Sequence, residues 1–274
     1  MKPLTPIVEA VLRASGCGES VEDVYEERGI TSWSVQRADW LLRHRSVVVE
    51  FKELAEDCFS GKIADVVRPY AADLGMSHGF IDINPVVRAH PHGARLSRDI
   101  DEVVTDVLRG DIEEANSQIR ATKKALKLNA ALGLVVVFNS ANAVLSERHT
   151  SVAMNRQLLR ARDRFESVNA TAVLNPYLEV TAKGADGRLP FFVYAYPSHA
   201  RARAADAAKD ICVALNAKFG PSGSNVPIVS GDSGMLPIRQ RFGEPVIAPK
   251  GTEPAEIIRA KEAARKLPQP GVAT

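Results

Sequence analysis

The spacing of apolar residues near the start of the chain predicts two short helices. Over residues 5–15 the apolar side chains recur at helical intervals and share one face: Ile7, Val8, Val11 and Leu12. A second helix is expected over residues 20–28, because Ser20 is a suitable N-cap and Gly29 a suitable C-terminal stop. Helical structure is therefore expected before the first strand.

An antiparallel pair of strands is expected next. Residues 32–42 have strand character, residues 43–46 are polar and typical of a turn, and residues 47–52 begin with three consecutive valines. If the turn is centred between His44 and Arg45, the numbers of directly opposed residues add up to 89. The pattern thus fixes a register as well as two strands.

The middle of the chain consists of an irregular segment followed by a predicted long helix. Residues 61–93 contain several prolines and glycines, and they predict no long element. Residues 97–128 predict one helix that Ser97 caps. Its apolar side chains form a single stripe: Ile100, Val104, Val107, Leu108, Ile112, Ala115, Ile119 and Leu126.

The second half predicts further strands and helices. Apolar runs favour strands at 134–138 and 170–174, and a Gly-rich turn between two strand-like runs favours a β-hairpin of 177–181 with 191–196. Helices are expected at 151–167, which is polar and arginine-rich, at 199–217 and at 253–266. Residues 220–251 are rich in Gly, Pro and Ser and predict an extended arm, and residues 267–274 a flexible tail.

This order of elements predicts an α/β (α+β) fold with a mixed central sheet flanked by helices. The chain has 274 residues, a length that allows one large domain or two small ones. We expect a single domain over 1–266, with a core over about 5–140, further strands and helices over 134–220, and then the arm.

Composition narrows the class of protein only slightly. Hydrophobic residues make up 45% and charged residues 25%, which are ordinary globular values. The net charge of +2 gives no support to a nucleic-acid partner, although a local basic cleft can exist on a near-neutral protein. The longest apolar run, 130–138, is about half of the ~20 residues that a membrane helix needs.

These features favour a soluble, cytoplasmic protein without a membrane partner. The cysteines are Cys17, Cys58 and Cys212, which are far apart and odd in number. We expect three reduced thiols, since their spacing suggests neither a zinc site nor a disulfide framework.

Three residues of the predicted strand pair carry the candidate chemistry. Asp39 and Glu50 satisfy the register, so they face each other with Cβ atoms about 5 Å apart. Lys52 lies two residues beyond Glu50 on the same strand and points to the same face. Facing carboxylates repel, and a divalent cation such as Mg²⁺ or Mn²⁺ removes that repulsion. The lysine then stands where it can polarise an attacking water or stabilise a phosphate.

This pattern resembles the PD-(D/E)xK nuclease superfamily. An Asp at position 39, and then Glu50-Phe51-Lys52 on a valine-rich strand, form the motif over 39–52, and the order of elements agrees over residues 5–140. The resemblance implies a restriction-endonuclease-like core in which Asp39 and Glu50 bind the metal and Lys52 assists the water. Ala38 stands where many members have proline.

Members of this superfamily often add a polar residue from the following helix. Gln118 is the candidate here, because it flanks the apolar stripe of the predicted long helix, as Lys123 does. The implied activity is metal-dependent hydrolysis of phosphodiester bonds, with DNA as the expected partner and a homodimer as a possibility that the sequence leaves open. The alternative is a non-catalytic protein that binds nucleic acid or protein on the same fold.

Other motifs favour ordinary structural roles. His90 and His92 suggest solvent-exposed loop residues more than a metal site, because no carboxylate is near in sequence. The Gly- and Ser-rich segments 222–225 and 230–234 lack the lysine and helix of a phosphate-binding loop. Basic residues within 123–127, 156–164 and 201–203 are more typical of solvated helix surfaces than of a phosphate-binding face.

Overall fold

The structure is a computed structural model with a mixed α/β architecture. The residues it describes are 5–30, 36–54, 59–76, 81–138, 147–174, 178–180, 191–195, 200–219, 228–230, 238–240 and 246–247. The predicted helix at 253–266 and the tail at 267–274 lie outside these residues.

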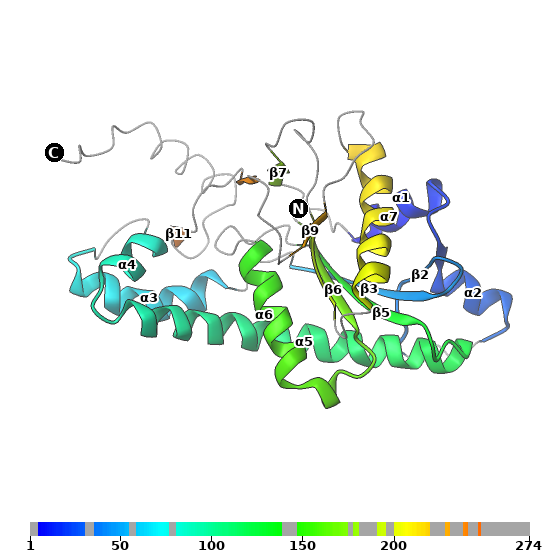
Figure 1. Cartoon of the computed structure of the whole chain (residues 1–274), viewed down its shortest axis with the longest axis horizontal. Coiled ribbons are helices and arrows are strands. Elements are labelled where there is room, and N and C mark those ends of the chain that lie inside the picture. Colours follow the sequence, from blue (N-terminus) through cyan, green and yellow to red (C-terminus); the bar gives the residue numbers. More distant parts are fainter. Residues whose placement is uncertain are drawn as a thin grey trace.

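A mixed sheet lies at the centre of the molecule (Figure 1). Its central strands β3, β5 and β6 are parallel, β1 and β2 are antiparallel additions at one edge, and β8 pairs antiparallel with β6 at the other. The strands in spatial order are β1 (Glu19–Ser20), β2 (Trp40–Leu42), β3 (Val47–Glu53), β5 (Leu132–Phe138), β6 (Ala170–Leu174), β8 (Phe191–Ala195) and β9 (Ile228–Ser230). The predicted mixed sheet with flanking helices is thereby confirmed.

Helices cover both faces of the sheet and form two hydrophobic cores. One face packs on α2 (Val21–Glu27), α5 (Gly93–Leu126) and α6 (Glu147–Arg160), and the opposite face on α1 (Thr5–Ala14) and α7 (Arg201–Phe219). Alternate residues of β3 divide between the cores: Val48 joins the first, while Val47, Val49 and Phe51 join the second. Such burial on both faces explains the unbroken apolar runs of the central strands.

The first two helices form as the sequence predicts. Val8, Val11 and Leu12 are the buried face of α1. Ser20 caps α2, because its side chain accepts a hydrogen bond from the Glu22 N–H over 3.2 Å. Gly29 then adopts a left-handed conformation with φ of 65°, which suits a residue without a Cβ.

The predicted strand at 32–42 is too long. Strand β2 covers only Trp40–Leu42, residues 36–38 are irregular, and 31–35 lie outside the described part. The predicted register is correct, however, since Trp40, Leu41 and Leu42 oppose Val49, Val48 and Val47. The turn at 43–46 forms as predicted, with three consecutive residues in the left-handed region, namely Arg43, His44 and Arg45.

The segment 61–93 was wrongly predicted to lack a long element. It contains α3 (Ser60–Asp73) with Pro69 inside it, and then α4 (Ile83–Ala89). A proline inside a helix removes one backbone hydrogen bond. Packing outweighs this cost, because α3 buries four side chains in the first core: Ile63, Ala64, Val67 and Ala71.

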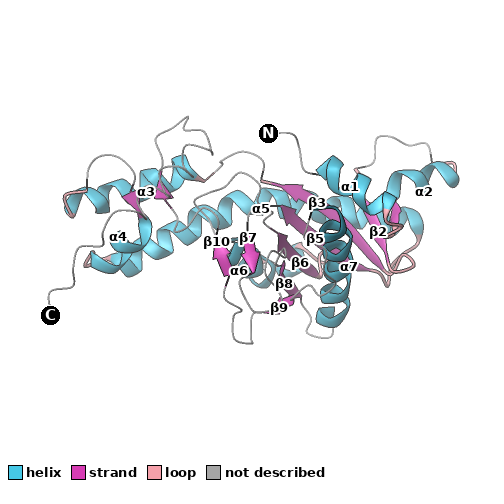
Figure 2. Cartoon of the chain, turned by 90° about the horizontal axis from the view of Figure 1, so that it is seen from above, coloured by secondary structure: helices cyan, strands magenta, loops and turns pink. Residues whose placement is uncertain are grey.

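Helix α5 begins four residues earlier than predicted. His92 rather than Ser97 is the residue at its N-terminal boundary, and Ser97 lies within the helix. Lys127 ends the helix in a left-handed conformation with φ of 58°. The C-terminal half of α5 packs on the sheet, and its N-terminal half extends away beside α3 and α4 (Figure 2).

Pairing in the second half differs from the prediction. Strands β7 (Leu178–Val180) and β8 do not form the predicted hairpin: β8 inserts between β6 and β9, and β7 pairs with β10 (Ile238–Gln240). The predicted helix at 151–167 is instead α6, which starts at Glu147 and is followed by a 3-10 turn at Arg162–Arg164. Helix α7 lies close to its predicted range.

The described residues of the predicted arm at 220–251 form short strands. Besides β9 and β10, strand β11 (Val246–Ile247) pairs with β4 (Ile81–Asp82). These strands use partners that are distant in the chain, and local sequence does not reveal such pairing. Within the described residues, every helix is too short or too polar to cross a membrane.

Candidate functional site

Asp39 lies in the bend that leads into β2, directly beside the C-terminal half of β3. Its backbone N–H donates to the Val49 carbonyl over 3.1 Å, one residue out of the register of β2 and β3, so the regular pairing ends at Trp40. Its carboxylate oxygen Oδ2 accepts from the Phe51 N–H over 2.7 Å. Two hydrogen bonds therefore fix Asp39 against the strand that carries Glu50 and Lys52.

Glu50 is a buried acid in the middle of β3. Its side chain is 3% exposed, and its neighbour in the sheet, Val135 of β5, is apolar. Burial, together with the neighbouring charge of Asp39, raises the pKa of Glu50 to about 9. Burial also raises the pKa of Asp39, although the Phe51 hydrogen bond and the charge of Lys52 oppose this. Without a bound cation, Glu50 would therefore keep its proton at neutral pH and hydrogen-bond to Asp39.

Lys52 is the positive charge of this cluster. Its ammonium Nζ lies 3.1 Å from Glu50 Oε1, 3.1 Å from Gln118 Oε1 and 3.0 Å from Glu114 Oε2. Burial opposes its charge, but the two glutamates outweigh burial and place the pKa of Lys52 above its usual value. Lys52 is therefore an ammonium group held at the border between core and solvent.

Helix α5 supplies the other wall of the site. Gln118 reaches Lys52 as its predicted position on the helical wheel requires. Four residues on, Thr122 accepts a hydrogen bond from the Ala38 N–H over 2.8 Å, which ties the helix to the residue before Asp39. The structure thus brings together all four residues that the sequence singles out: Asp39, Glu50, Lys52 and Gln118.

Further acids near this cluster escaped the sequence-based prediction. Glu114 contacts Lys52 from one turn before Gln118, and Asp111 is close enough for Lys52 and Glu114 to influence its pKa, which burial raises. Spacing at i, i+3 and i+7 on a predicted helix was an available signal. This spacing does not identify a site by itself, because Asp111 and Glu114 could equally be solvated surface charges.

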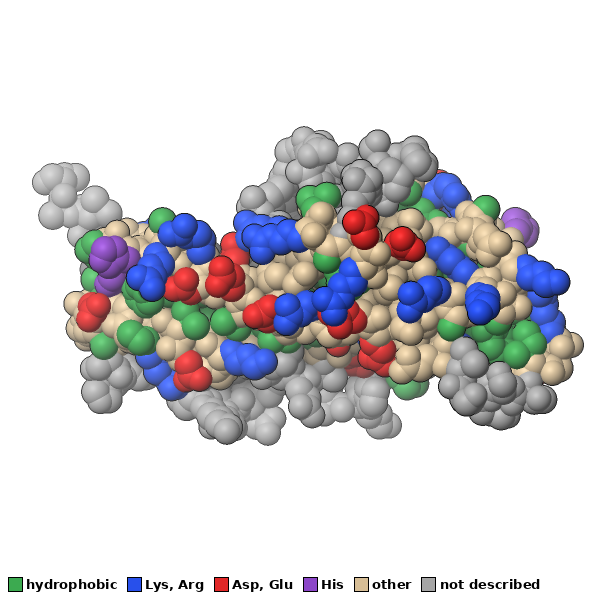
Figure 3. All heavy atoms as spheres, turned by 90° about the horizontal axis from the view of Figure 1, so that it is seen from below, with side chains coloured by type: hydrophobic (Ala, Val, Ile, Leu, Met, Phe, Trp, Pro, Cys, Tyr) green, Lys and Arg blue, Asp and Glu red, His purple; other side chains and the backbone are tan. Residues whose placement is uncertain are grey.

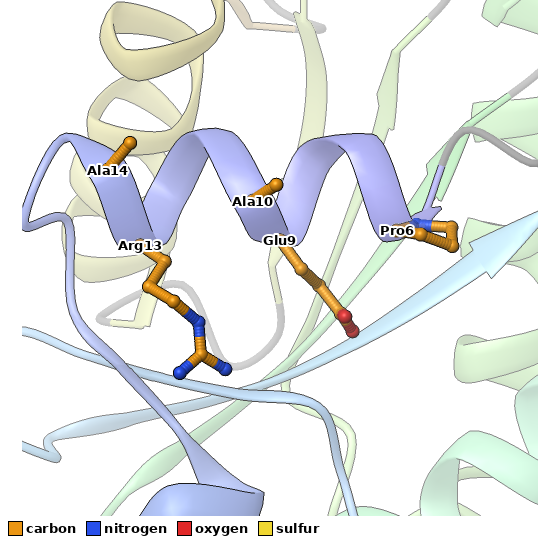
Figure 4. Close-up of a pocket in the computed structure, with 5 residues that line it drawn as sticks. All are labelled: Pro6, Glu9, Ala10, Arg13 and Ala14. Carbon is orange, nitrogen blue, oxygen red and sulfur yellow. The ribbon is translucent and has the colours of Figure 1, made fainter.

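Glu9 of α1 also belongs to the surroundings of Asp39. Burial raises the pKa of Glu9, and the charge of Asp39 raises it further. Figure 4 shows Glu9 and Arg13 pointing the same way from α1. They line a shallow surface pocket together with Pro6, Ala10 and Ala14. In the sequence, Glu9 appears only as a charge that interrupts an apolar stretch.

The carboxylates fit a hard divalent cation in one specific respect. Oxygen Oε2 of Glu50 is buried and accepts no hydrogen bond, so once the proton that Glu50 shares with Asp39 is lost, this oxygen has no donor. An unsatisfied buried polar atom costs about 1–3 kcal/mol, and a bound cation would satisfy it. Among the described residues, no three His, Cys, Asp or Glu side chains lie close enough together to hold a metal ion. Asp39 and Glu50 would therefore be two protein ligands of Mg²⁺ or Mn²⁺, and water would complete the coordination shell.

His90 has a structural role that the sequence did not predict, whereas His92 is exposed as expected. A carboxylate is near after all, since His90 Nε2 lies 3.3 Å from Asp73 Oδ2 of α3. His90 Nδ1 accepts from the His92 N–H over 3.0 Å, and its ring meets Tyr70 edge-on. His90 is 6% exposed in its side chain rather than solvated, and it joins α3 to the start of α5.

Basic groups outside the cluster are largely matched by acids or carbonyls. Lys123 turns away from Lys52 and donates to the Ser167 carbonyl over 3.1 Å, and burial lowers its pKa to about 8. Arg156 pairs with Asp101, and Arg164 pairs with Glu113 over 2.8 Å. Figure 3 shows basic and acidic side chains interleaved on the face below α5, as expected for solvated helix surfaces.

Comparisons of the chain with family models, with curated proteins and with solved structures each gave no match. The assignment of a function therefore depends on the geometry of the cluster around Lys52.

Proposed function

We propose that this protein is a Mg²⁺- or Mn²⁺-dependent nuclease that hydrolyses phosphodiester bonds in DNA. One observation carries the proposal. Toward the end of β3, an ammonium group lies 3.1 Å from the buried Glu50 carboxyl group, and the Asp39 carboxyl group is fixed beside it and hydrogen-bonds to it. Burying such a set costs free energy, which is typical of a functional site rather than of a stabilising ion pair.

The order of elements supports a restriction-endonuclease-like core. Helix α1 is followed by β1, β2 and β3, which pair antiparallel and have α2 between the first two, then after α3, β4 and α4 by the long helix α5, and then by β5, which pairs parallel with β3. This is the order expected from the resemblance to the PD-(D/E)xK superfamily. The motif residues stand on β3 and just before β2, where that resemblance places them.

Each residue has a distinct part in the proposed reaction. A bound cation would supply Lewis-acid stabilisation of the phosphate. Asp39 and Glu50 would hold it, and Glu50 must first lose its proton. Lys52 would orient the attacking water or neutralise charge that develops on the phosphate. Gln118 holds the Lys52 ammonium from the helix side and so fixes the direction of its N–H bonds.

A non-catalytic binding protein on the same fold is the second candidate. Two observations favour it: the net charge is only +2, and the Lys52 ammonium already contacts three acceptors. Such a protein would keep the cluster as an internal ion-pair network and would gain nothing from a divalent cation.

Cleavage assays separate the two candidates. Supercoiled plasmid, linear duplex DNA, single-stranded DNA and RNA are incubated with the protein in Mg²⁺, in Mn²⁺ and in EDTA. The nuclease proposal predicts metal-dependent cleavage of at least one DNA substrate, and its loss in Glu50→Gln. A folded protein that binds DNA without cutting it in either metal would support the binding protein instead.

A further inference from the structure

The Lys52 ammonium group has no hydrogen-bond donor to spare. A lysine carries three N–H donors. Three acceptors surround Nζ, and each lies within 3.1 Å: Glu50 Oε1, Gln118 Oε1 and Glu114 Oε2. For Lys52 to act on a water molecule or a phosphate, one of these partners must release it.

The three partners differ in how easily they can leave. Glu50 is fixed in the middle of a central strand, and its side chain is 3% exposed. Gln118 is partly buried on the helix face that packs toward the sheet. Glu114 is 49% exposed, so water can solvate its carboxylate as soon as a new rotamer moves it away from Lys52. Glu114 is thus the partner that costs least to displace.

The chemistry of the Glu114 carboxylate matches that of the expected substrate. A carboxylate and a phosphate are both anionic oxygen acceptors that form charge-assisted hydrogen bonds with an ammonium group. Glu114 is the exposed partner of Lys52, so an anion from solvent would compete for this contact before it could reach the buried Glu50.

We propose that Glu114 is an exchangeable positioning residue whose carboxylate occupies the place on Lys52 that a backbone phosphate of DNA takes in the complex. Glu114 holds Lys52 aligned with Gln118 in the free protein and competes with the substrate for it. This inference rests on the proposed nuclease function, and it assigns the regulation of substrate affinity to a residue outside the D…ExK motif.

The consequence is a separation between affinity and turnover. Replacing Glu114 by glutamine removes the competing charge but keeps the size and a neutral acceptor. We expect Glu114→Gln to bind DNA roughly two- to fivefold more tightly, and to lower KM with little change in kcat. A residue with a purely structural role would not produce tighter binding.

Glu113 provides a matched control for the loss of negative charge. It lies on the same helix, it differs from Glu114 by one position, and it pairs with Arg164 and Arg109 rather than with Lys52. Glu113→Gln changes the net charge by the same amount. The two variants therefore lose the same charge but release different cations, Lys52 in one and Arg164 with Arg109 in the other.

The test is a double-mutant cycle on DNA binding. A fluorescein-labelled 20-base-pair duplex is titrated with the full chain in Ca²⁺, which is chosen to slow cleavage, and fluorescence anisotropy is recorded. The variants are wild type, Glu114→Gln, Glu113→Gln, Lys52→Met and Glu114→Gln with Lys52→Met, each checked for folding by circular dichroism. We expect the gain from Glu114→Gln to vanish in the Lys52→Met background and to be absent in Glu113→Gln.

Two other outcomes overturn the inference in different ways. An equal gain in Glu113→Gln, or a gain that persists without Lys52, would reduce Glu114 to a general negative charge while leaving the nuclease proposal intact. The second outcome is that no folded variant, including wild type, binds the duplex at low salt. That result would overturn the DNA-directed function and with it the role of Glu114.

Discussion

Lys52 of β3 and Gln118 of α5 are joined by a 3.1 Å hydrogen bond, although 66 positions separate them in the chain. The bond fixes the long helix on the strand that carries the E-x-K motif. It also leaves the Gln118 amide nitrogen free of any role in holding Lys52, so the residue acts through its carbonyl oxygen alone.

This contact predicts a catalytic defect without a large loss of stability. Gln118→Ala removes one of three acceptors and releases the Lys52 ammonium toward its two glutamates. We expect about a tenfold lower rate of DNA cleavage at saturating Mg²⁺, with a loss of unfolding free energy near 1 kcal/mol. Single-turnover cleavage and urea denaturation measure the two effects. Ser117→Ala, on the adjacent position of α5, serves as the control and should cut at the wild-type rate.

The buried Glu50 carboxyl predicts how the metal-free protein responds to pH. Its pKa rises from 4.5 in the unfolded chain to about 9 in the folded protein. Between these values the folded state binds more protons than the unfolded state, so stability falls as the pH rises through this window. Glu50→Gln removes the titrating group. We expect the variant to exceed wild type in unfolding free energy by roughly 1–3 kcal/mol at pH 8 in EDTA.

The same comparison at pH 4 supplies the control for Glu50→Gln. There the wild-type carboxyl is protonated in the folded state and mostly protonated in the unfolded state, so the difference between the two proteins should become small. A difference that is constant from pH 4 to pH 8 in urea denaturation would show that Glu50 does not titrate in this window.

Asp39 predicts a specific effect on metal binding. Asp39→Asn keeps an oxygen that can accept from the Phe51 N–H but removes the negative charge. We expect Mn²⁺ to raise the melting temperature of wild type by several degrees, because a ligand that binds only the folded state stabilises it. The rise should be lost in Asp39→Asn. Differential scanning fluorimetry measures both, and an equal rise in the variant would place the metal elsewhere.

Much of the site was predictable because it depends on local rules. The strand register follows from the four-residue turn at 43–46, and period-two alternation then places Glu50 and Lys52 on one face. Helical periodicity placed Gln118 above that face, since the apolar stripe of the long helix had to contact the sheet. Local pattern therefore predicted the positions of four polar side chains.

The remaining features depend on contacts that no local pattern encodes. Pro69 lies inside α3 because tertiary packing outweighs the helix-breaking tendency of proline. The predicted hairpin fails because β8 finds β6 and β9 as better partners than its neighbour in sequence. Glu114 differs from any surface glutamate only through its contact with Lys52, which requires the fold to be known.

Gly133 predicts a strong effect on stability. A Cβ at this position of β5 would lie 1.9 Å from the Ser167 carbonyl oxygen, which belongs to the backbone and cannot easily move. We expect Gly133→Ala to cost about 2 kcal/mol or more of unfolding free energy, measured by urea denaturation. Gly110→Ala is the matched control, because its Cβ would meet nothing within 4 Å and alanine favours the helix. That variant should be as stable as wild type or more so.

The most direct test of the nuclease proposal is cleavage by Lys52→Ala compared with Lys62→Ala. Lys62 is an exposed lysine at the start of α3, so its removal changes the net charge equally but leaves the cluster intact. With Mg²⁺ or Mn²⁺ and a DNA substrate, we predict that wild type and Lys62→Ala cut, while Lys52→Ala loses activity by about 100-fold or more. Wild-type rates in folded Lys52→Ala would contradict the proposed site.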